Sequence, residues 1–162
     1  MRIELIPTDQ INKESHQNLI LESVEYSPFY HISHVENVIN SHLDKLIRNP
    51  DSYVMIIAKD DQTGKLLGQL LVGLNFGDFG LIQPWQPIIY PNTNRMEIAI
   101  KLIEKSKIII KLYQKTKIEI WMELESDHDK LLHTEYEEWY HKCKFQETST
   151  EYNMALPYSM LP

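Results

Sequence analysis

The sequence predicts an α/β protein, of mixed α+β type, in which helices pack against a mixed sheet. Two observations lead to this fold class. A strand pattern, a polar loop, a long helical pattern and a second strand pattern follow one another between residues 82 and 124. Apolar residues also recur at helical spacing over residues 94–115, in a stripe broad enough to cover a sheet. With 162 residues and 43% hydrophobic content, the chain suits a single domain spanning residues 1–162.

The first third of the chain predicts one strand and two helices. Residues 2–6 are typical of a short strand. A helix is expected over residues 8–25, with Thr8 or Asp9 as its N-cap. After an aromatic segment, a second amphipathic pattern predicts a helix over residues 33–48.

The middle of the chain predicts a three-stranded meander. Residues 53–58 and 66–74 are typical of strands, lie on either side of a polar turn and are expected to form a hairpin. Residues 81–90 are expected to add a third strand. Proline cannot donate to a strand ladder, so Pro84 and Pro87 indicate a bulge or an unpaired edge within it.

The last part predicts a helix, a strand, a helix and β-prone residues. The first helix is expected to run from Asn94 to about Tyr113, and strand 117–124, helix 133–142 and the β-prone tail 145–156 follow. The face expected to pack on the sheet comprises Ala99, Leu102, Ile103, Ser106, Ile109, Ile110 and Tyr113, widened by Ile98, Ile108 and Leu112.

The segment Pro91-Asn92-Thr93-Asn94-Arg95-Met96-Glu97-Ile98-Ala99 joins the third strand to the long helix. A loop that follows a strand and opens a helix presents free backbone N–H groups and the positive end of the helix dipole. Both favour the binding of a phosphate or pyrophosphate.

This loop resembles the pyrophosphate loop of the GNAT N-acetyltransferases, which reads roughly Pro-x-x-Arg/Gln-x-x-Gly-x-Gly/Ala. Pro91 and Ala99 match, Asn94 stands at the Arg/Gln position, and Glu97 stands where the family has glycine. The order of predicted elements is similar to the GNAT order along nearly the whole chain. The resemblance implies a mixed, mainly antiparallel, twisted sheet flanked by helices on both faces.

The resemblance also implies an activity, the direct transfer of an acetyl group from acetyl-CoA to an amine. The end of the third strand would pair with the pantetheine arm, and a backbone N–H there would polarise the thioester carbonyl. The following helix start would hold the pyrophosphate. The cofactor-binding residues implied in this way are Ile88, Ile89, Tyr90, Asn94, Arg95, Met96, Glu97, Ile98 and Ala99.

Tyr140 is the implied catalytic residue. The stretch from Trp139 to Phe145 resembles the family's Leu-Tyr-x-x-x-Gly-Phe signature, although Lys144 replaces the glycine. The resemblance places Tyr140 as the general acid that protonates the departing thiolate. The alternative is an aromatic side chain that only packs beneath its helix.

Glu97 supports a second, non-enzymatic interpretation. Asn94 and Glu97 have the spacing of a capping box, in which the carboxylate reaches back to the Asn94 N–H. A carboxylate at this place would repel a pyrophosphate by about 4 kcal/mol at ~4 Å unless Arg95 or Lys101 offsets it. Acetyl-CoA binding would then be weakened or lost, and the chain would be an inactive GNAT-fold binding, regulatory or scaffold module.

Two segments would choose the acceptor amine in a protein of this family, the one between the first two helices and the last loops. The resemblance points to Tyr26, Phe29 and Tyr30, between the first two helices, as substrate-binding residues. Acidic residues between Glu123 and Asp129 would attract a protonated amine of a polyamine, an aminoglycoside or a protein, unless they simply form a solvated loop.

Composition limits the partners. A net charge of −7 disfavours nucleic acids and anionic membranes, and no apolar run reaches the ~20 residues of a membrane span. We therefore expect a cytoplasmic protein, with exposed strand edges that favour a homodimer. The chain has one cysteine, Cys143, which excludes an intrachain disulfide and Cys-rich zinc sites. The lysines on either side could lower the pKa of its thiol and make it reactive, but an inert thiol is the favoured interpretation. The histidine spacing predicts no metal site.

Overall fold

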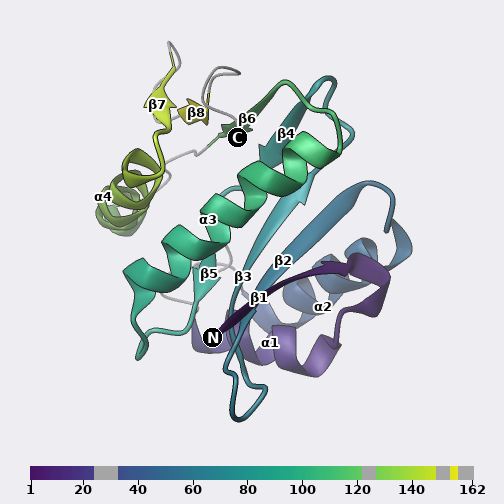
Figure 1. The fold of residues 1–162 in the computed structure, drawn as a ribbon. Helices are drawn as coiled ribbons and strands as arrows, with labels where there is room; N and C mark the ends of the chain where they lie inside the picture. The colour runs from purple at the N-terminus through teal and green to yellow at the C-terminus, as the bar shows by residue number, and fades with distance from the viewer. Residues whose placement is uncertain (24–32, 122–126, 149–153, 157–162) are drawn as a thin grey trace.

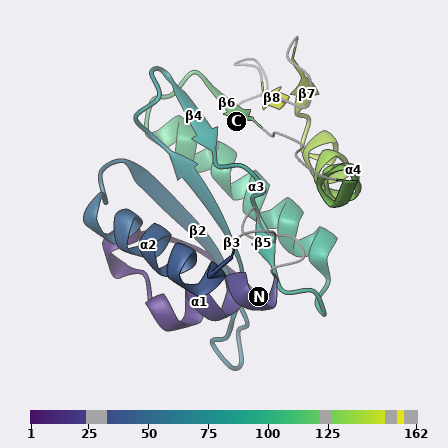
Figure 2. The ribbon, with the colours of Figure 1, turned by 180° about the vertical axis from the view of Figure 1, so that it is seen from behind.

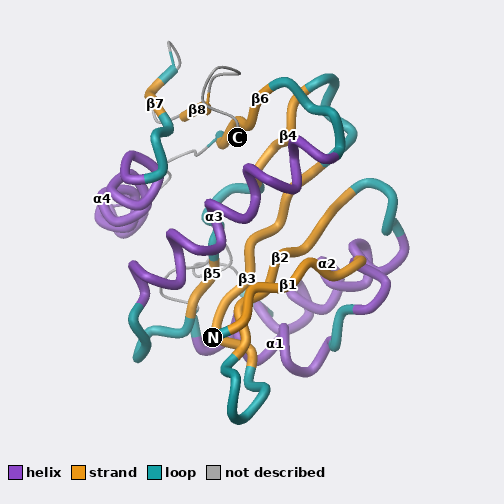
Figure 3. Tube along the Cα trace, in the orientation of Figure 1, coloured by secondary structure: helices purple, strands orange, loops and turns teal. Residues whose placement is uncertain are grey.

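The structure is a computed structural model of the chain and describes residues 1–23, 33–121, 127–148 and 154–156. Its strands are β1 (Arg2–Pro7), β2 (Tyr53–Lys59), β3 (Leu66–Gly73), β4 (Phe79–Ile82), β5 (Ile88–Ile89), β6 (Lys117–Ile120), β7 (Gln146–Glu147) and β8 (Met154–Leu156). They form one sheet in the order β1-β2-β3-β4-β6-β8-β7, and β5 pairs with β3 (Figure 3). Among these described strands, β4 and β6 run parallel and the other pairs are antiparallel.

Helices cover both faces of this sheet. The helices are α1 (Lys13–Glu22), α2 (Val35–Arg48), α3 (Arg95–Leu112) and α4 (Asp127–Lys142), and a 3-10 turn, η1 (Thr8–Gln10), follows β1. Helix α3 crosses one face diagonally and α4 lies beside it (Figure 1). Helices α1 and α2 cover the opposite face (Figure 2). The predicted mixed, mainly antiparallel sheet with helices on both faces is confirmed.

The central strands are apolar on both faces because each face has its own core. Along β2, Val54 and Ile56 pack with residues of α3 and α4, whereas Met55 and Ile57 pack with residues of α1 and α2. Successive side chains of a strand point to opposite faces, so a strand covered on both sides needs a continuous apolar run. That requirement explains the unbroken run of strand 53–58 in the sequence.

Helix α1 begins later than predicted. Asn12 is its N-cap and accepts a hydrogen bond from the Ser15 N–H at 3.1 Å. Thr8 and Asp9 lie in the 3-10 turn instead. The Thr8 hydroxyl donates to the Leu46 carbonyl at 2.7 Å, so it joins the first strand to the end of α2 rather than capping a helix.

Helix α3 agrees with its predicted bounds but has a narrower buried face. Asn94 is the N-cap, as expected. Ile108 and Leu112, expected to widen the buried face, are 48% and 75% exposed. Each is two residues, or about 200° of helix rotation, from the buried Ile110, so both lie on the opposite side. Tyr113, which follows the last turn, is also exposed.

Two other predicted boundaries are wrong. The third strand is not continuous over 81–90 but consists of β4 and β5. Helix α4 begins at Asp127 rather than near residue 133. The predicted end of strand 117–124 lies outside the described residues. Among the helices that the structure describes, none combines the length and the apolarity needed to span a membrane.

Candidate active site

The break between β4 and β5 is the first feature of the site. Val72 pairs with Ile82 of β4, and Gln69 pairs with Ile88 of β5. Between these two pairs β3 advances by three residues, whereas the chain from β4 to β5 advances by six. Three extra residues are therefore looped out of the ladder. Gln86 fills part of the gap, because its side-chain oxygen accepts from the Leu71 N–H at 3.3 Å. The bulge expected from the two prolines is present.

Two tyrosines of α4 hold this loop from one side. The Tyr140 hydroxyl donates to the Gln86 carbonyl at 2.5 Å. The Tyr136 hydroxyl lies 3.0 Å from the carbonyls of both Trp85 and Pro87. Both tyrosines are fully buried, and burial raises the pKa of the Tyr140 phenol well above its usual value. The Tyr140 hydroxyl is therefore a neutral donor whose hydrogen bond is made to the broken strand.

The break separates β5 from β6. The parallel ladder between β4 and β6 ends at the pair Ile82–Ile120. The Tyr90 N–H bonds to the Leu67 carbonyl at 3.1 Å, which is the register of the β5–β3 ladder. Because polar groups of an antiparallel strand alternate in direction, the N–H and C=O of Ile89 point away from β3. Among the strands that the structure describes, none pairs with this edge of β5.

Side chains of the protein already contact the Ile89 carbonyl. It accepts from the Ser23 hydroxyl at 3.0 Å and from Arg95 Nη1 at 2.7 Å. Arg95 is held by Glu135 of α4, whose Oε1 accepts from Nε at 2.9 Å and from Nη2 at 2.6 Å. The guanidinium also lies over the Trp139 ring, 5.2 Å from its centroid. We call Arg95 and Glu135 the β5 clasp, since together they connect α4 to the open edge of β5.

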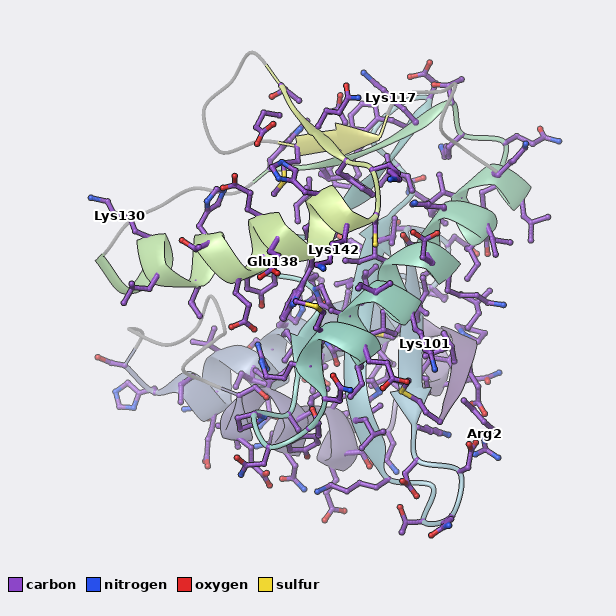
Figure 4. All side chains as sticks on the ribbon, turned by 60° about the vertical axis from the view of Figure 1, so that its left-hand side comes forward. Arg2, Lys101, Lys117, Lys130, Glu138 and Lys142 are labelled. Atoms are coloured by element: carbon purple, nitrogen blue, oxygen red, sulfur yellow. The ribbon has the colours of Figure 1, made fainter. Side chains whose placement is uncertain are left out.

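The start of α3 is capped by its own side chains. Asn94 Oδ1 accepts from the Glu97 N–H at 3.4 Å, and Asn94 Nδ2 donates to Glu97 Oε2 at 3.0 Å. The expected reciprocal pair is present, although the carboxylate binds the Asn94 side chain rather than its backbone N–H. Lys101, labelled in Figure 4, approaches Glu97 Oε1 to 3.0 Å. Lys101 therefore offsets the Glu97 charge, while Arg95 turns away to the clasp.

The structure brings most of the predicted cofactor-binding residues to one corner, where β5 leads into α3. Ile98 and Ala99 are buried against the sheet, and the Ile98 N–H is already bonded to the Asn94 carbonyl at 3.1 Å. In the first turn of α3, residues 95–97, the Arg95 N–H bonds to the Thr93 carbonyl at 2.9 Å and the Glu97 N–H bonds to Asn94 Oδ1 at 3.4 Å. The predicted substrate residues Tyr26, Phe29 and Tyr30 lie outside the described residues.

Sequence reasoning missed three residues of this corner: Trp85, Glu135 and Tyr136. Trp85 adopts a left-handed backbone conformation with φ 59° and is buried, which no local pattern indicates. Glu135 is separated from Arg95 by 40 positions. The signal for Tyr136 was the four-residue spacing to Tyr140, which places both hydroxyls on one face of α4.

Cys143, at the end of α4, is buried beside this aromatic cluster. Burial, together with Glu104, raises the pKa of its thiol to about 12. A thiol with such a pKa is almost entirely protonated at neutral pH and is a poor nucleophile. The inert interpretation of Cys143 is the one that the structure supports.

No protein-family model and no curated protein sequence matches the chain. Solved structures do match it. The PaiA N-acetyltransferase of Thermoplasma acidophilum, in complex with coenzyme A, superposes with a TM-score of 0.67 at 14% identity, over 98% of this chain and 100% of that one. The spermidine N-acetyltransferase of Vibrio cholerae, in complex with CoA and spermine, gives 0.70 at 15% identity, over 98% and 97%. An aminoglycoside 6′-acetyltransferase type Ii gives 0.71 at 14% identity, over 100% and 99%.

The chain has the GNAT fold. At these identities the likeness concerns the fold, and it agrees with the resemblance found in the loop and the element order. In this GNAT-fold chain the break after β4, the open edge of β5 and the start of α3 follow one another within residues 83–97. These three features are the candidate site.

Proposed function

We propose that the chain is an N-acyltransferase that transfers an acetyl group from acetyl-CoA to an amine by direct attack. The observation that carries this proposal is the edge of β5 next to the N-terminus of α3, with which no described strand pairs. Ile89 directs an N–H and a C=O to that edge, which are the groups that an amide-containing pantetheine arm needs. The start of α3 follows at residues 95–97, where the helix dipole favours a pyrophosphate. The N–H groups of Arg95 and Glu97 would have to exchange Thr93 and Asn94 for the phosphate oxygens.

The chemistry asks little more of the protein. The amine nitrogen forms a bond to the thioester carbon and loses a proton, while the carbon–sulfur bond breaks and the thiolate takes up a proton. A backbone N–H of the broken strand would stabilise the developing oxyanion. Tyr140 is proposed as the acid for the thiolate, because its hydroxyl is neutral and lies at the break itself.

The site fits the cofactor only after a local rearrangement. The β5 clasp already uses the Ile89 carbonyl, and the Tyr140 hydroxyl is bonded to Gln86. A pantetheine arm would have to displace Arg95 or the Ser23 hydroxyl from the Ile89 carbonyl before it could pair there. The cost of this displacement lowers the affinity for acetyl-CoA relative to a site that is open in advance.

The same contacts favour a second candidate function. If the clasp and the buried Tyr140 are permanent, the chain is a GNAT-fold module without catalysis that serves as a binding, regulatory or scaffold subunit. The Glu97 carboxylate at the helix start supports this alternative, since it adds negative charge where a pyrophosphate would bind. The two candidates differ in catalysis, and the non-enzymatic module would bind acetyl-CoA weakly or not at all.

The proposed acceptor is a cationic amine. Two of the structurally similar proteins are a spermidine and an aminoglycoside acetyltransferase, and their named substrates are both cationic amines. The net charge of −7 of this chain would attract such molecules over a range of several ångströms at low salt.

Acetyl-CoA binding is the first experiment. A ligand that binds only the folded protein raises its melting temperature. A free ligand concentration of about 100 times Kd adds about 2.7 kcal/mol to the free energy of unfolding. We expect a rise at millimolar acetyl-CoA, and a smaller rise with adenosine diphosphate at the same concentration, because adenosine diphosphate has the pyrophosphate but lacks the pantetheine arm. Acetyl transfer to spermidine or an aminoglycoside releases CoA, and a thiol reagent detects this product. The buried Cys143 adds little background signal to that assay. If acetyl-CoA changes the melting temperature of neither the wild type nor the Glu97→Gly variant, the acetyltransferase proposal is wrong and the non-enzymatic module is the remaining candidate.

A further inference from the structure

The C-terminal half of α4 carries a cluster of metal-binding side chains away from β5. Glu137 and His141 are one turn apart on α4, and Glu147 comes from β7. One donor atom from each, two carboxylate oxygens and a ring nitrogen, lies within 4.8 Å of the other two. His141 Nε2 is 2.7 Å from Glu147 Oε1, and His141 Nδ1 is 4.0 Å from Glu137 Oε1. We call these three residues the α4–β7 cluster.

The turn between α4 and β7 fixes the cluster. Lys144 takes a left-handed conformation with φ 73°, and the Phe145 N–H bonds back to the Tyr140 carbonyl at 3.0 Å. Phe145 is buried and packs edge-on against the Tyr140 ring, with centroids 5.0 Å apart. The chain therefore reverses at once, and Glu147 returns alongside His141. The packed turn therefore fixes the backbone positions from which His141 and Glu147 extend.

We propose that the α4–β7 cluster is a binding site for a first-row divalent metal ion of the Zn²⁺ class. Imidazole together with carboxylates is a donor set that Zn²⁺, Ni²⁺ and Cu²⁺ accept, whereas Mg²⁺ and Ca²⁺ prefer oxygen alone. Three protein ligands leave the fourth position of a tetrahedral ion to water. The cluster borders an open hollow of ≈ 480 Å³ lined by Thr134, Glu137, Glu138, His141 and Lys142, so both the ion and the water have access.

Two further features of α4 support the ion. His133 Nδ1 lies 3.3 Å from Glu137 Oε2, the oxygen not needed as a ligand, and such outer contacts orient a metal-binding carboxylate. His141 is also in the last turn of α4, where the negative end of the helix dipole stabilises a cation. The bound ion would tie β7 to α4, and this role is independent of acetyl transfer.

The cluster needs only small side-chain movements to hold the ion. Donors around a tetrahedral Zn²⁺ are about 3.3 Å apart, since each metal–ligand bond is about 2.0–2.1 Å. His141 and Glu147 must therefore separate slightly, and Glu137 must approach. Both movements are rotations of side chains that are exposed or half-buried. The histidine spacing alone had predicted no metal site, because two of the ligands are carboxylates and one belongs to another element.

Zinc titration of the tag-free, metal-free protein tests the proposal by calorimetry. We expect one equivalent of Zn²⁺ to bind with a dissociation constant below about 100 µM and to raise the melting temperature. His141→Gln and Glu147→Gln should each weaken binding about tenfold or more, and His133→Gln should weaken it less. Glu138→Gln is the matched control, because Glu138 lines the same hollow on the same helix but is not in the cluster (Figure 4).

Either of two results would overturn the site. One is wild-type protein that shows no saturable zinc binding up to 1 mM. The other is a His141→Gln variant that binds zinc as tightly as the wild type, which would place any bound metal elsewhere in the chain. A circular dichroism spectrum for each variant shows whether a loss of binding reflects a loss of the fold.

Discussion

At the scale of single residues, Tyr140 has a structural contact and a proposed chemical role at the same atom. Its hydroxyl bonds to the Gln86 carbonyl in a fully buried setting, and its proposed role is to protonate a thiolate at the same break in the strand. A general acid must be protonated when it acts, and the raised pKa keeps Tyr140 so at every physiological pH. Burial is thus compatible with the role, provided that the thiolate reaches the hydroxyl.

Tyr140→Phe separates the two contributions. The variant keeps the ring and leaves the Gln86 carbonyl without its donor, so we expect a loss of about 1–3 kcal/mol in unfolding free energy. If Tyr140 is also the acid, turnover falls by about 10²–10⁴-fold while acetyl-CoA still binds. Denaturant unfolding and steady-state rates measure the two effects, at a temperature where both proteins are folded. Turnover equal to that of the wild type would leave Tyr140 with its structural contact alone.

At the scale of elements, the β5 clasp connects α4 to the strand that the cofactor would pair with. The Arg95 side chain is only 13% exposed, and hydrogen bonds to Glu135 and to the Ile89 carbonyl hold it in this corner. Its position at the Ile89 carbonyl makes it a competitor of the pantetheine arm. The clasp would set the affinity for acetyl-CoA through the energy needed to open it.

Glu135→Ala opens the clasp from the α4 side. Without Glu135, Arg95 loses two of its hydrogen bonds and can turn to solvent or to a pyrophosphate, so acetyl-CoA should bind several-fold more tightly. The partner is about a third exposed, so we expect a stability loss of about 1 kcal/mol or less. Calorimetry measures the affinity, with Glu138→Ala on the exposed side of α4 as the matched control. Weaker binding in Glu135→Ala would mean that the clasp holds Arg95 in place for the cofactor.

The start of α3 offers a second element-scale change. Glu97→Gly removes both the charge and the bulk that oppose a pyrophosphate, and Glu97→Gln removes the charge alone. Because Lys101 already offsets Glu97 at an exposed position, we expect the charge to account for about tenfold in affinity and not more. Both variants should lose a little helix stability with the cap. Acetyl-CoA titrations test the pyrophosphate site. The site is supported if Glu97→Gly binds most tightly, Glu97→Gln less tightly and the wild type most weakly, and equal affinities contradict it.

At the scale of the whole molecule, the fold was readable from the sequence because its signals are local. Residues 53–58 are an unbroken apolar run that precedes a turn, and the helix after Asn94 has a periodic stripe. The loop 91–99 was recognisable for the same reason. Contacts across the chain had no such signal: Arg95 with Glu135 and Tyr140 with Gln86 join residues 40 and 54 positions apart. The sequence therefore predicted a candidate cofactor site at this corner, but not that side chains of α3 and α4 already contact it.

The global stability should depend on pH through His16. Its Nδ1 lies 2.6 Å from Gln69 Oε1 in the core beneath α1. Burial lowers the pKa of His16, the nearby Lys59 acts in the same direction, and the Gln69 hydrogen bond opposes them. Below about pH 6.5, His16 binds a proton in the unfolded chain but stays neutral in the native chain. The free energy of unfolding therefore falls as the pH drops below about 6.5, by up to about 1.4 kcal/mol per pH unit. The fall ends at the lower pKa that His16 has in the native chain. Urea unfolding at pH 7, 6 and 5 should show this fall, with a smaller slope in the His16→Gln variant. The same slope in His16→Gln as in the wild type would assign the pH dependence to other groups.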